Sequence, residues 1–222
     1  MQDLRRILDA YALGGPVRVA NVVGARIVDA ALDRWLGIRA AGLVPIESLV
    51  TDWADLHDYY PTSFRTFVRL LAYVPAEAYS GTFVDVGSGK GRVLALAARR
   101  PFRSVVGIEI SEALNAIARD NVARVGRHLK CHDVRVLTAD AAAVTMPDDA
   151  TVFYFYNPFH GPPLSAVLAN IEASLARRPR AATVIFNNTR HIAKREVEFP
   201  WLRPVARLER EHPCAVYRVG TP

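Results

Sequence analysis

An acidic residue inside an apolar run, followed by closely spaced glycines, is the pattern with the most chemistry in this sequence. Residues 83–94 read Phe-Val-Asp-Val-Gly-Ser-Gly-Lys-Gly-Arg-Val-Leu, so Asp85 lies in a strand-like run that leads into Gly87, Gly89, Gly91 and a helical pattern. Glycines at a strand-to-helix turn let the backbone approach a ligand and leave helix N-terminal N–H groups free to bind it. A buried carboxylate is costly unless it has a partner. The pattern therefore predicts that a polar ligand docks beside Asp85.

Two more apolar runs lead to acidic residues. Glu109 ends a run about 20 residues beyond the glycine turn, the spacing that places a carboxylate on ribose hydroxyls in dinucleotide-binding folds. A carboxylate can accept hydrogen bonds from both hydroxyls of a cis-diol. Asp140 follows a third run, where it could also serve as the N-cap of a helix. These acids are candidates for the walls of one binding site.

A fourth apolar run, residues 153–156, delivers the sequence Asn-Pro-Phe-His at 157–160. Ligands of open α/β sheets bind at the carboxyl ends of the strands, so we expect Asn157 to lie near the glycine turn. Asn-Pro is also a common start of a turn, and this role alone would explain the motif.

Three histidines are candidates for proton transfer. His57, His160 and His191 could each act as a general base, since an unperturbed imidazole titrates near neutrality. A lone histidine is more often a surface or packing residue, and His160 is favoured because it adjoins Asn157. The sequence shows no HxxxH, histidine–cysteine or paired-carboxylate spacing, so we expect no metal site.

The elements that must position these residues alternate between strand and helix from residue 82 onward. Short apolar runs cover 82–86, 104–110, 133–138, 151–156 and 182–186, and helical stretches lie near 90–100, 111–126 and 162–177. This alternation predicts βαβ units and a parallel sheet buried on both faces. Runs at 202–209 and 214–219, joined around Glu211-His212-Pro213, predict a terminal antiparallel hairpin. We therefore expect an α/β fold: a doubly wound, Rossmann-like sheet of seven mostly parallel strands.

The first 80 residues have a different pattern. Residues 16–36 place polar side chains at helical spacing with apolar ones opposite, which predicts an amphipathic helix. An irregular segment follows, and Pro61-Thr62-Ser63 opens a second helix. We expect a helical cap or lid at residues 1–80 and a second domain at 81–222. The apolar helix face could cover that domain or pair with a second copy in a homodimer.

The composition and charge of the chain limit the kinds of molecule that we expect it to bind. The net charge is +6, but the arginines are scattered rather than interleaved with aromatic residues, so nucleic acid is not the expected partner. Five charged residues interrupt the long apolar stretch 16–36 and would be costly in a bilayer. The two cysteines are far apart and are expected to be free thiols. We expect a cytoplasmic protein that does not enter a membrane.

Three known types of glycine-rich turn could account for residues 87–92. A Walker loop needs a Ser or Thr after its lysine, and the dinucleotide fingerprint is GxGxxG; Gly-Ser-Gly-Lys-Gly-Arg fits neither. The spacing Asp-x-Gly-x-Gly-x-Gly does fit the class I (Rossmann-like) S-adenosylmethionine-dependent methyltransferases, which the chain resembles over about residues 60–190. The resemblance implies S-adenosyl-L-methionine as cofactor. It also implies that the cofactor's methionine part contacts Asp85, Gly87, Ser88, Gly89 and Gly91.

The same resemblance assigns the remaining candidates. It places Glu109 on the ribose, and Asp140 and the N–H of Ala141 at the adenine edge. Tyr59-Tyr60-Pro61-Thr62-Ser63 is similar to a segment of small lysine methyltransferases of the non-SET type, which implies that Tyr60 and Thr62 are lid contacts over the cofactor. Pro61-Thr62-Ser63 could equally be a plain helix start with Tyr60 in the core.

Asn157 looks like part of a shortened Asn-Pro-Pro-aromatic motif of amino-group methyltransferases, with one proline missing. There the asparagine oxygen holds a target nitrogen against the methyl group. We therefore expect methyl transfer to a nitrogen nucleophile, either a protein lysine or a small-molecule amine. Two alternatives remain: an O-methyltransferase of a small secondary metabolite, and a non-catalytic cofactor-binding partner protein.

Overall fold

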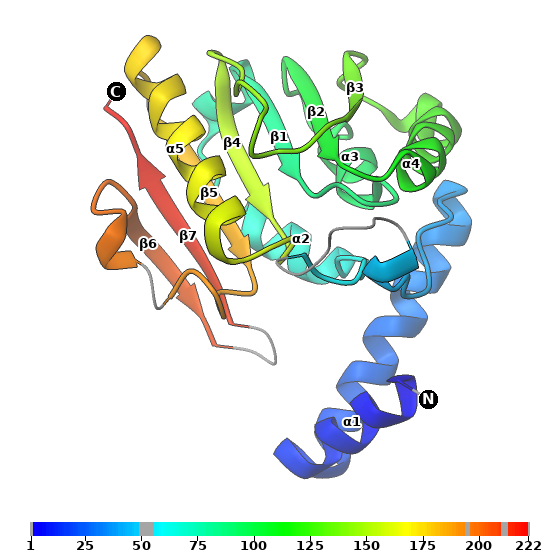
Figure 1. Ribbon diagram of the computed structural model, residues 1–222. Coiled ribbons are helices and arrows are strands. Elements are labelled where there is room, and N and C mark those ends of the chain that lie inside the picture. Colours follow the sequence, from blue (N-terminus) through cyan, green and yellow to red (C-terminus); the bar gives the residue numbers. More distant parts are fainter. Residues whose placement is uncertain (1, 49–55, 194–195, 210–212, 222) are drawn as a thin grey trace.

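The computed structural model describes residues 2–48, 56–193, 196–209 and 213–221 (Figure 1). The side chains of 2–14, 18, 21 and 46 are not described. The predicted turn at Glu211 and His212 lies outside these ranges.

Seven strands form one sheet in the order β3-β2-β1-β4-β5-β7-β6. They are β1 (Thr82–Val86), β2 (Ser104–Glu109), β3 (Val134–Thr138), β4 (Ala150–Phe155), β5 (Ala182–Asn187), β6 (Arg203–Leu208) and β7 (Cys214–Val219). The first five are parallel, whereas β7 runs antiparallel to both β5 and β6. The predicted Rossmann-like α/β sheet with a terminal antiparallel hairpin is confirmed.

Helices cover both faces of this sheet (Figure 1). The α-helices are α1 (Gln2–Leu36), α2 (Phe64–Leu71), α3 (Arg92–Ala97), α4 (Glu112–Val125) and α5 (Gly161–Arg177). Short 3₁₀ turns are η1 (Ile46–Ser48), η2 (Ala76–Ser80), η3 (Gly126–His128) and η4 (Glu196–Glu198). None of the helices in the described ranges is long and apolar enough to span a membrane.

The core is divided by the sheet into two hydrophobic clusters. On one face Phe67 of α2 packs edge-on against Phe83 of β1, together with side chains of α3 and α4. On the other face α5 packs against Val84 and Phe153. Neighbouring residues of β1 thus point to opposite faces, as the two-residue period of a strand requires. Because α2 shares a core with β1, residues 64–71 are packed as part of the same body; the proposed domain boundary at 80/81 stays a prediction.

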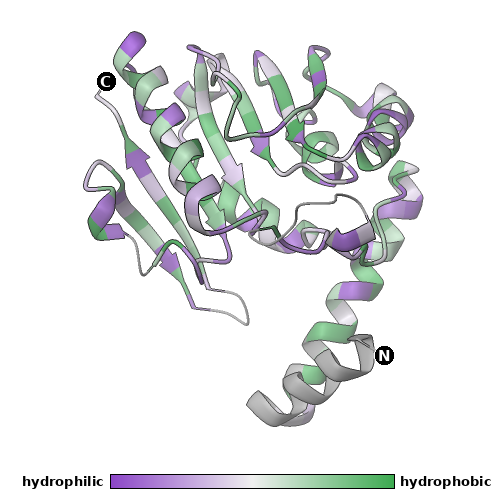
Figure 2. Cartoon of the chain, in the orientation of Figure 1, coloured by the Kyte–Doolittle hydropathy of each residue, from purple (hydrophilic) through white to green (hydrophobic). Residues whose placement is uncertain are grey.

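The first helix differs from its prediction in length and in orientation. It begins at Gln2 instead of residue 16, runs through Pro16, and its N-terminal half projects away from the sheet (Figure 1). Its described part carries hydrophobic bands between hydrophilic ones (Figure 2). The apolar residues Ile27 and Val28 are 64% and 52% exposed, whereas Asp33 is 5% exposed and faces the domain. Polar contacts and the buried Leu36 at its end therefore attach this helix, and the homodimer through its apolar residues stays a prediction.

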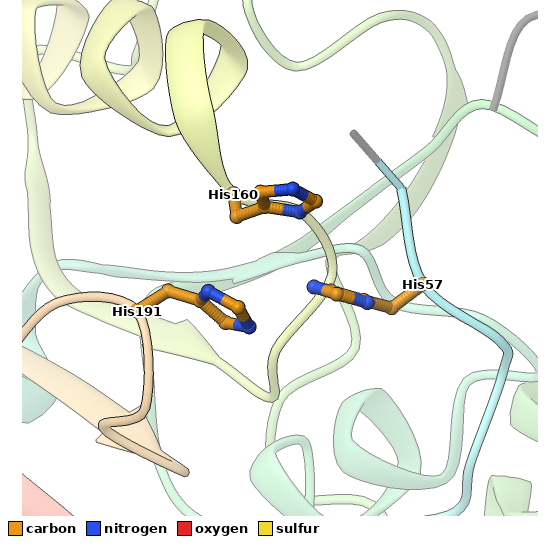
Figure 3. Close-up of side chains that lie close together, drawn as sticks. All are labelled: His57, His160 and His191. Carbon is orange, nitrogen blue, oxygen red and sulfur yellow. The ribbon is translucent and has the colours of Figure 1, made fainter. Parts of the chain in front are cut away.

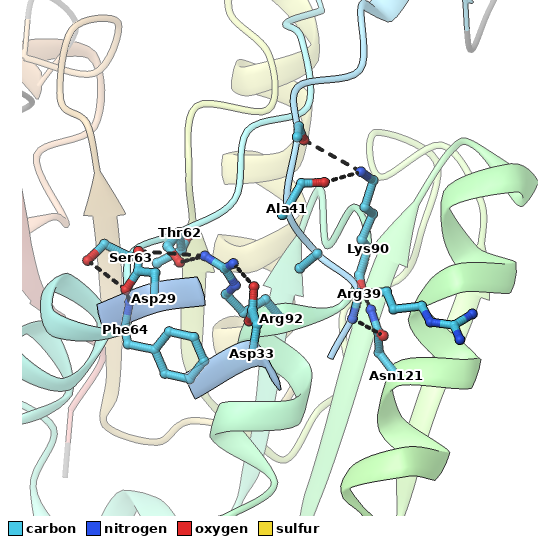
Figure 4. Close-up of polar contacts among 12 residues, drawn as sticks. Asp29, Asp33, Arg39, Ala41, Thr62, Ser63, Phe64, Lys90, Arg92 and Asn121 are labelled. Atoms are coloured by element: carbon cyan, nitrogen blue, oxygen red, sulfur yellow. Dashed lines mark hydrogen bonds and ion pairs between the residues drawn. The ribbon is translucent and has the colours of Figure 1, made fainter. Parts of the chain in front are cut away.

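Arg92 is the centre of that attachment (Figure 4). Its buried guanidinium forms an ion pair with Asp33, lies 3.8 Å from Asp29 Oδ2, and donates a 2.9 Å hydrogen bond to the carbonyl oxygen of Thr62. The N–H of Phe64 donates to Asp29 Oδ1 at 3.0 Å. Arg92 is the first residue of α3, where the helix dipole disfavours a positive charge. The two aspartates of α1 offset that cost and join the helix to the glycine turn.

A second link runs from the glycine turn to the segment after α1 (Figure 4). Lys90 donates a 2.9 Å hydrogen bond to the carbonyl oxygen of Ala41. Asn121 of α4 donates to the Lys90 carbonyl at 2.8 Å and accepts from the Arg39 N–H at 2.7 Å. Burial, with Arg92 nearby, lowers the pKa of Lys90. The two basic residues of the Gly-Lys-Gly-Arg sequence therefore hold the N-terminal segment in place.

The buried ion pair gives a stability prediction. Asp33→Ala leaves the Arg92 guanidinium buried without its main partner, so we expect the free energy of unfolding to fall by about 3 kcal/mol. The matched control is Asp120→Ala, which removes an exposed i,i+4 partner of Arg124 on α4 and should hardly change stability. Urea unfolding followed by circular dichroism measures both. Equal effects of the two substitutions would show that burial of the Arg92 pair is irrelevant.

Candidate functional site

A cleft lies at the carboxyl ends of β1, β2 and β4, beneath the segment 56–62. Its volume is about 850 Å³, counting the mouth that opens to solvent. Two backbone contacts hold the covering segment: the His57 N–H donates to the Pro158 carbonyl at 3.1 Å, and Leu56 bridges to Phe159. Most of the predicted site residues line this cleft, namely Tyr60, Thr62, Asp85, Gly87, Ser88, Glu109, Asp140, Ala141 and Asn157.

The glycine turn is shaped by close contacts that leave no room for side chains. Gly87 has φ of 75°, and a Cβ there would lie 2.3 Å from Cβ of Pro158. Gly89 has φ of 53°, and a Cβ there would lie 2.3 Å from the ring of Tyr59. Gly91 caps α3 with φ of 74°. Gly89 and Gly91 do not line the described cleft, so they shape the turn, and their contact with a cofactor stays a prediction.

Two buried acids line the cleft, Asp85 and Glu109. Asp85 is 3% exposed, and the described residues give its carboxylate no hydrogen bond. Burial and the neighbouring Glu109 raise the pKa of Asp85 well above its usual value. Glu109 accepts backbone hydrogen bonds of 3.0 Å from Gly89 and from Ser111, yet burial still raises its pKa. A carboxylate offers about four lone-pair sites, so Glu109 keeps capacity for a ligand.

Ser88 supplies a second unsatisfied group. Its hydroxyl lines the cleft, is buried, and finds no hydrogen-bond partner among the described residues. Buried polar groups without partners are rare in native proteins and are usually explained by a ligand, water or ion. The hydroxyl of Ser88 and the carboxylate of Asp85 thus fit a ligand with a positively charged hydrogen-bond donor, such as the amino group of S-adenosylmethionine.

The wall beyond β2 and β3 combines apolar surface with one more acid. Asp140 accepts a 2.9 Å hydrogen bond from the Ala142 N–H and so caps a turn; no helix begins there. Ala141 is 7% exposed. Ile110, which directly follows Glu109, lines the cleft with 41% of its surface exposed. The sequence pattern did not single out Ile110, although an apolar residue just past a strand-end acid is a signal for it.

The covering segment is tied to the core by hydroxyl groups. The Thr62 hydroxyl is 3.3 Å from the Tyr154 hydroxyl, which accepts a 3.0 Å hydrogen bond from Asn187. Tyr60 accepts a 3.2 Å hydrogen bond from Arg26 of α1. The Tyr59 hydroxyl donates to the Ala40 carbonyl at 2.9 Å. The segment therefore lies over the cleft as expected for a lid, and the role of Tyr60 and Thr62 against a cofactor stays a prediction.

Asn157 lies where the sequence motif places it, just beyond β4 and in the wall of the cleft. Its φ is 50°, a left-handed conformation that asparagine tolerates better than most residues. That conformation lets Pro158 turn back onto Gly87. The asparagine, the glycine turn and the buried acids are thus parts of one site.

The three candidate histidines lie together rather than singly, and their roles stay predictions. The rings of His57 and His160 are 5.0 Å apart, and His57 and His191 are 4.9 Å apart, centroid to centroid. His57 lines the cleft, while His160 does not line it in the described residues. Burial and the two other histidines lower the pKa of His57 to about 4. The role of His160 as a general base stays a prediction.

The lining of the cleft is rich in acidic residues although the chain is basic. Four carboxylates line it, those of Asp58, Asp85, Glu109 and Asp140. Arg92 also lines it, but its charge is paired with Asp33. Charges at low local dielectric act strongly, so the cleft favours ligands that carry positive charge.

Comparison with known proteins agrees with the geometry. The family described as "Methyltransferase domain" matches residues 83–178. The fold is shared with the Methanobacterium thermoautotrophicum precorrin 8w decarboxylase (18% identity, 80% of this chain and 100% of that one, TM-score 0.55). It is also shared with a ribosomal protein L11 methylase from Lactobacillus delbrueckii subsp. bulgaricus (16%, 72% and 81%, 0.54). A third is a SAM-dependent methyltransferase from Aquifex aeolicus (17%, 69% and 88%, 0.53). No curated protein matches significantly.

The strand order defines a Rossmann-like α/β fold, and acidic residues line the cleft at its strand ends. Residues 83–178, which hold the glycine turn and all three strand-end acids, match a methyltransferase domain. This match and the shared fold support an S-adenosylmethionine-dependent methyltransferase.

The glycine turn gives a second prediction. Gly89→Ala places a methyl group against the Tyr59 ring at a positive φ, so we expect the free energy of unfolding to fall by about 1–3 kcal/mol and cofactor affinity to fall with it. Gly126→Ala is the control, because φ there is −23° and no atom lies within 4 Å of the added carbon. Urea unfolding and calorimetric titration with S-adenosylmethionine measure the two effects. Adding Tyr59→Ala to Gly89→Ala should recover part of the loss; no recovery would contradict the contact.

Proposed function

We propose that this protein transfers a methyl group from S-adenosylmethionine to a nitrogen nucleophile, either a protein lysine or a small-molecule amine. The observation that carries the proposal is the position of Asn157: it lines the same cleft as Asp85 and Glu109. Donor site and acceptor site then share one cavity, as a direct transfer requires.

The donor end follows from charge and hydrogen bonding. Asp85 and the Ser88 hydroxyl would hold the amino group of the methionine part, because both lack partners of their own among the described residues. The remaining lone pairs of Glu109 would accept from the ribose hydroxyls. Ile110 and Ala141 offer apolar surface to the adenine ring, with Asp140 at its edge. Each contact keeps the role that the resemblance to class I methyltransferases implies.

The acceptor end depends on Asn157. A side-chain carbonyl oxygen accepts a hydrogen bond from an N–H group, which orients the nitrogen and leaves its lone pair free to attack. The left-handed backbone at Asn157 fixes this orientation, since Pro158 is packed on Gly87. The carboxylates that line the cleft also favour an amine, which approaches as a cation.

The methyl donor needs little further activation by the protein. S-adenosylmethionine supplies a methyl group already activated by its sulfonium charge, so the chain's task is to align the acceptor and exclude water. The segment 56–62 covers the cleft and is attached to it through Leu56, His57 and Thr62. An amine acceptor must lose a proton, and His57 with a pKa of about 4 is a weak acceptor of it, so solvent is the expected destination.

Cofactor binding should be coupled to proton release. The pKa of Asp85 is raised in the free protein, whereas a cation beside it favours the ionised form; binding therefore expels protons, and affinity falls as pH falls. Calorimetry at about pH 6, where an α-amino group is protonated, in buffers of different ionisation enthalpy measures the release.

The isosteric variant Asp85→Asn should abolish that proton release and weaken binding about tenfold or more. Glu112→Gln is the control, because Glu112 is exposed and does not line the described cleft. Binding enthalpies that do not depend on the buffer in the wild-type protein would contradict the assignment of Asp85.

The acceptor assignment has its own test. Incubation with methyl-labelled cofactor and fractions of protein, nucleic acid and small molecules should place the label on nitrogen, in a product that resists the mild base that cleaves methyl esters. Asn157→Gly deletes the side chain without straining a positive φ, and we expect kcat to fall about 100-fold with cofactor affinity nearly unchanged.

Label found on oxygen of a small molecule would replace the nitrogen acceptor with the O-methyltransferase alternative. Cofactor binding without label in any fraction would favour a non-catalytic partner protein. Asn157→Asp, which keeps an oxygen acceptor, should retain more activity than Asn157→Gly if the oxygen holds the nitrogen.

A further inference from the structure

Three imidazole rings from distant parts of the chain converge (Figure 3). His57 belongs to the covering segment, His160 precedes α5, and His191 lies in the turn after β5. Their ring centroids are 4.9–5.0 Å apart in all three pairs. One nitrogen of each ring can be chosen so that all three lie within 4.8 Å of one another.

Each histidine is carried by backbone that is fixed from outside the cluster. The His57 N–H is bonded to the Pro158 carbonyl, which also sets the distance to His160 two residues later. The turn that carries His191 is closed by hydrogen bonds from Thr189 to Pro213 (2.7 Å) and from Ala193 to Thr189 (2.9 Å). Ile192, next to His191, is 1% exposed and buried in the core. The convergence of the rings is thus built into the fold.

We propose that His57, His160 and His191 form a binding site for a divalent transition-metal ion, with Zn²⁺ as the best match. Imidazole nitrogen is a preferred ligand of zinc, copper, nickel and iron. Three protein ligands leave the fourth position of a tetrahedral zinc to water or another small ligand, as in known three-histidine sites.

The distances allow metal binding after small side-chain movements. Zinc–nitrogen bonds of about 2.0–2.1 Å in a tetrahedron place the nitrogens roughly 3.3 Å apart. The ring nitrogens, which now lie within 4.8 Å of one another, must therefore move closer together. The three histidines are half-buried rather than fully buried, so rotation of their side chains can bring the nitrogens closer. The Nε2 atom of His57 is buried and finds no hydrogen-bond partner among the described residues, as a metal ligand would require.

The charges around the cluster neither favour nor prevent a cation strongly. The carboxylate of Asp58 and the guanidinium of Arg190 both act on His57, with opposite signs. The binding energy must therefore come from the nitrogen–metal bonds.

The position of the proposed metal site indicates what its fourth coordination position would face. His57 lines the cleft, and His160 is three residues from Asn157. If the proposed function holds, a metal there would lie on the acceptor side and could bind a donor atom of the acceptor. The metal site itself is independent of that function, because it needs only the three histidines.

Metal binding can be measured without cofactor or acceptor. Tag-free protein is treated with chelator, dialysed, and titrated with Zn²⁺ by calorimetry and with Co²⁺ by visible absorption. We expect one ion per chain, a Co²⁺ spectrum of a four-coordinate site, and a melting temperature raised by about 5 °C or more at saturating Zn²⁺.

The variants separate the cluster from adventitious binding. His191→Ala should lower Zn²⁺ affinity at least about tenfold and abolish the Co²⁺ spectrum, and His57→Ala and His160→Ala should do the same. His132→Ala, at an exposed histidine far from the cluster in sequence, is the matched control and should bind as the wild type does. Addition of imidazole should alter the Co²⁺ spectrum if one coordination place is open.

Absence of stoichiometric binding to the wild-type protein, or equal binding by the His57, His160 and His191 variants, would overturn the proposal and leave a purely structural cluster of stacked rings. Circular dichroism and the unchanged binding of S-adenosylmethionine by His191→Ala would show that the variant is folded. Methyl transfer with no metal bound would leave the proposed function intact, so the two proposals fail separately.

Discussion

The burial of Asp85 in the central strand is the constraint on which the rest of the site depends. A carboxylate that is 3% exposed in β1, next to a second buried acid, is costly in the free protein. Its position at the carboxyl end of the sheet directs it into a cleft rather than into the hydrophobic core. Everything that surrounds it, from the glycine turn to the covering segment, shapes the space in which a positive ligand can offset that cost.

The glycine turn connects this site to the N-terminal segment through side chains as well as backbone. Lys90 and Arg92, which alternate with the glycines, hold Ala41 and helix α1 by a hydrogen bond and a buried ion pair. These two side chains therefore link the packing of α1 and of the segment that follows it to the glycine turn.

The sequence predicted the sheet and most of the cleft because both follow from local patterns. Continuous β-branched runs are typical of buried parallel strands, and in such a sheet every strand-end residue lies at the same edge. Asp85, Glu109, Asp140 and Asn157 could thus be brought together from their places in the pattern alone. The spacing of residues along one strand or helix is enough to predict which of them lie at the same edge of the sheet.

Contacts between distant segments could not be predicted in the same way. The three histidines belong to three loops with no common period, and only the fold brings their rings to 5.0 Å. The helix at the N-terminus was predicted to be amphipathic, with its apolar face covering the domain or a second copy, but Asp29 and Asp33 contact the buried Arg92. Hydrophobic periodicity cannot reveal a buried ion pair, since its members look like surface residues in the sequence.

The acidic lining of the cleft also affects the exchange of product for substrate. The chain carries a net charge of +6, yet four carboxylates line the site, so the local field opposes the overall one. Transfer of the methyl group removes the sulfonium charge from the donor and leaves a neutral thioether. The carboxylates therefore attract the substrate form of the cofactor more strongly than the product form. The charges that favour binding of the methyl donor therefore also favour exchange of the demethylated product for a new donor molecule.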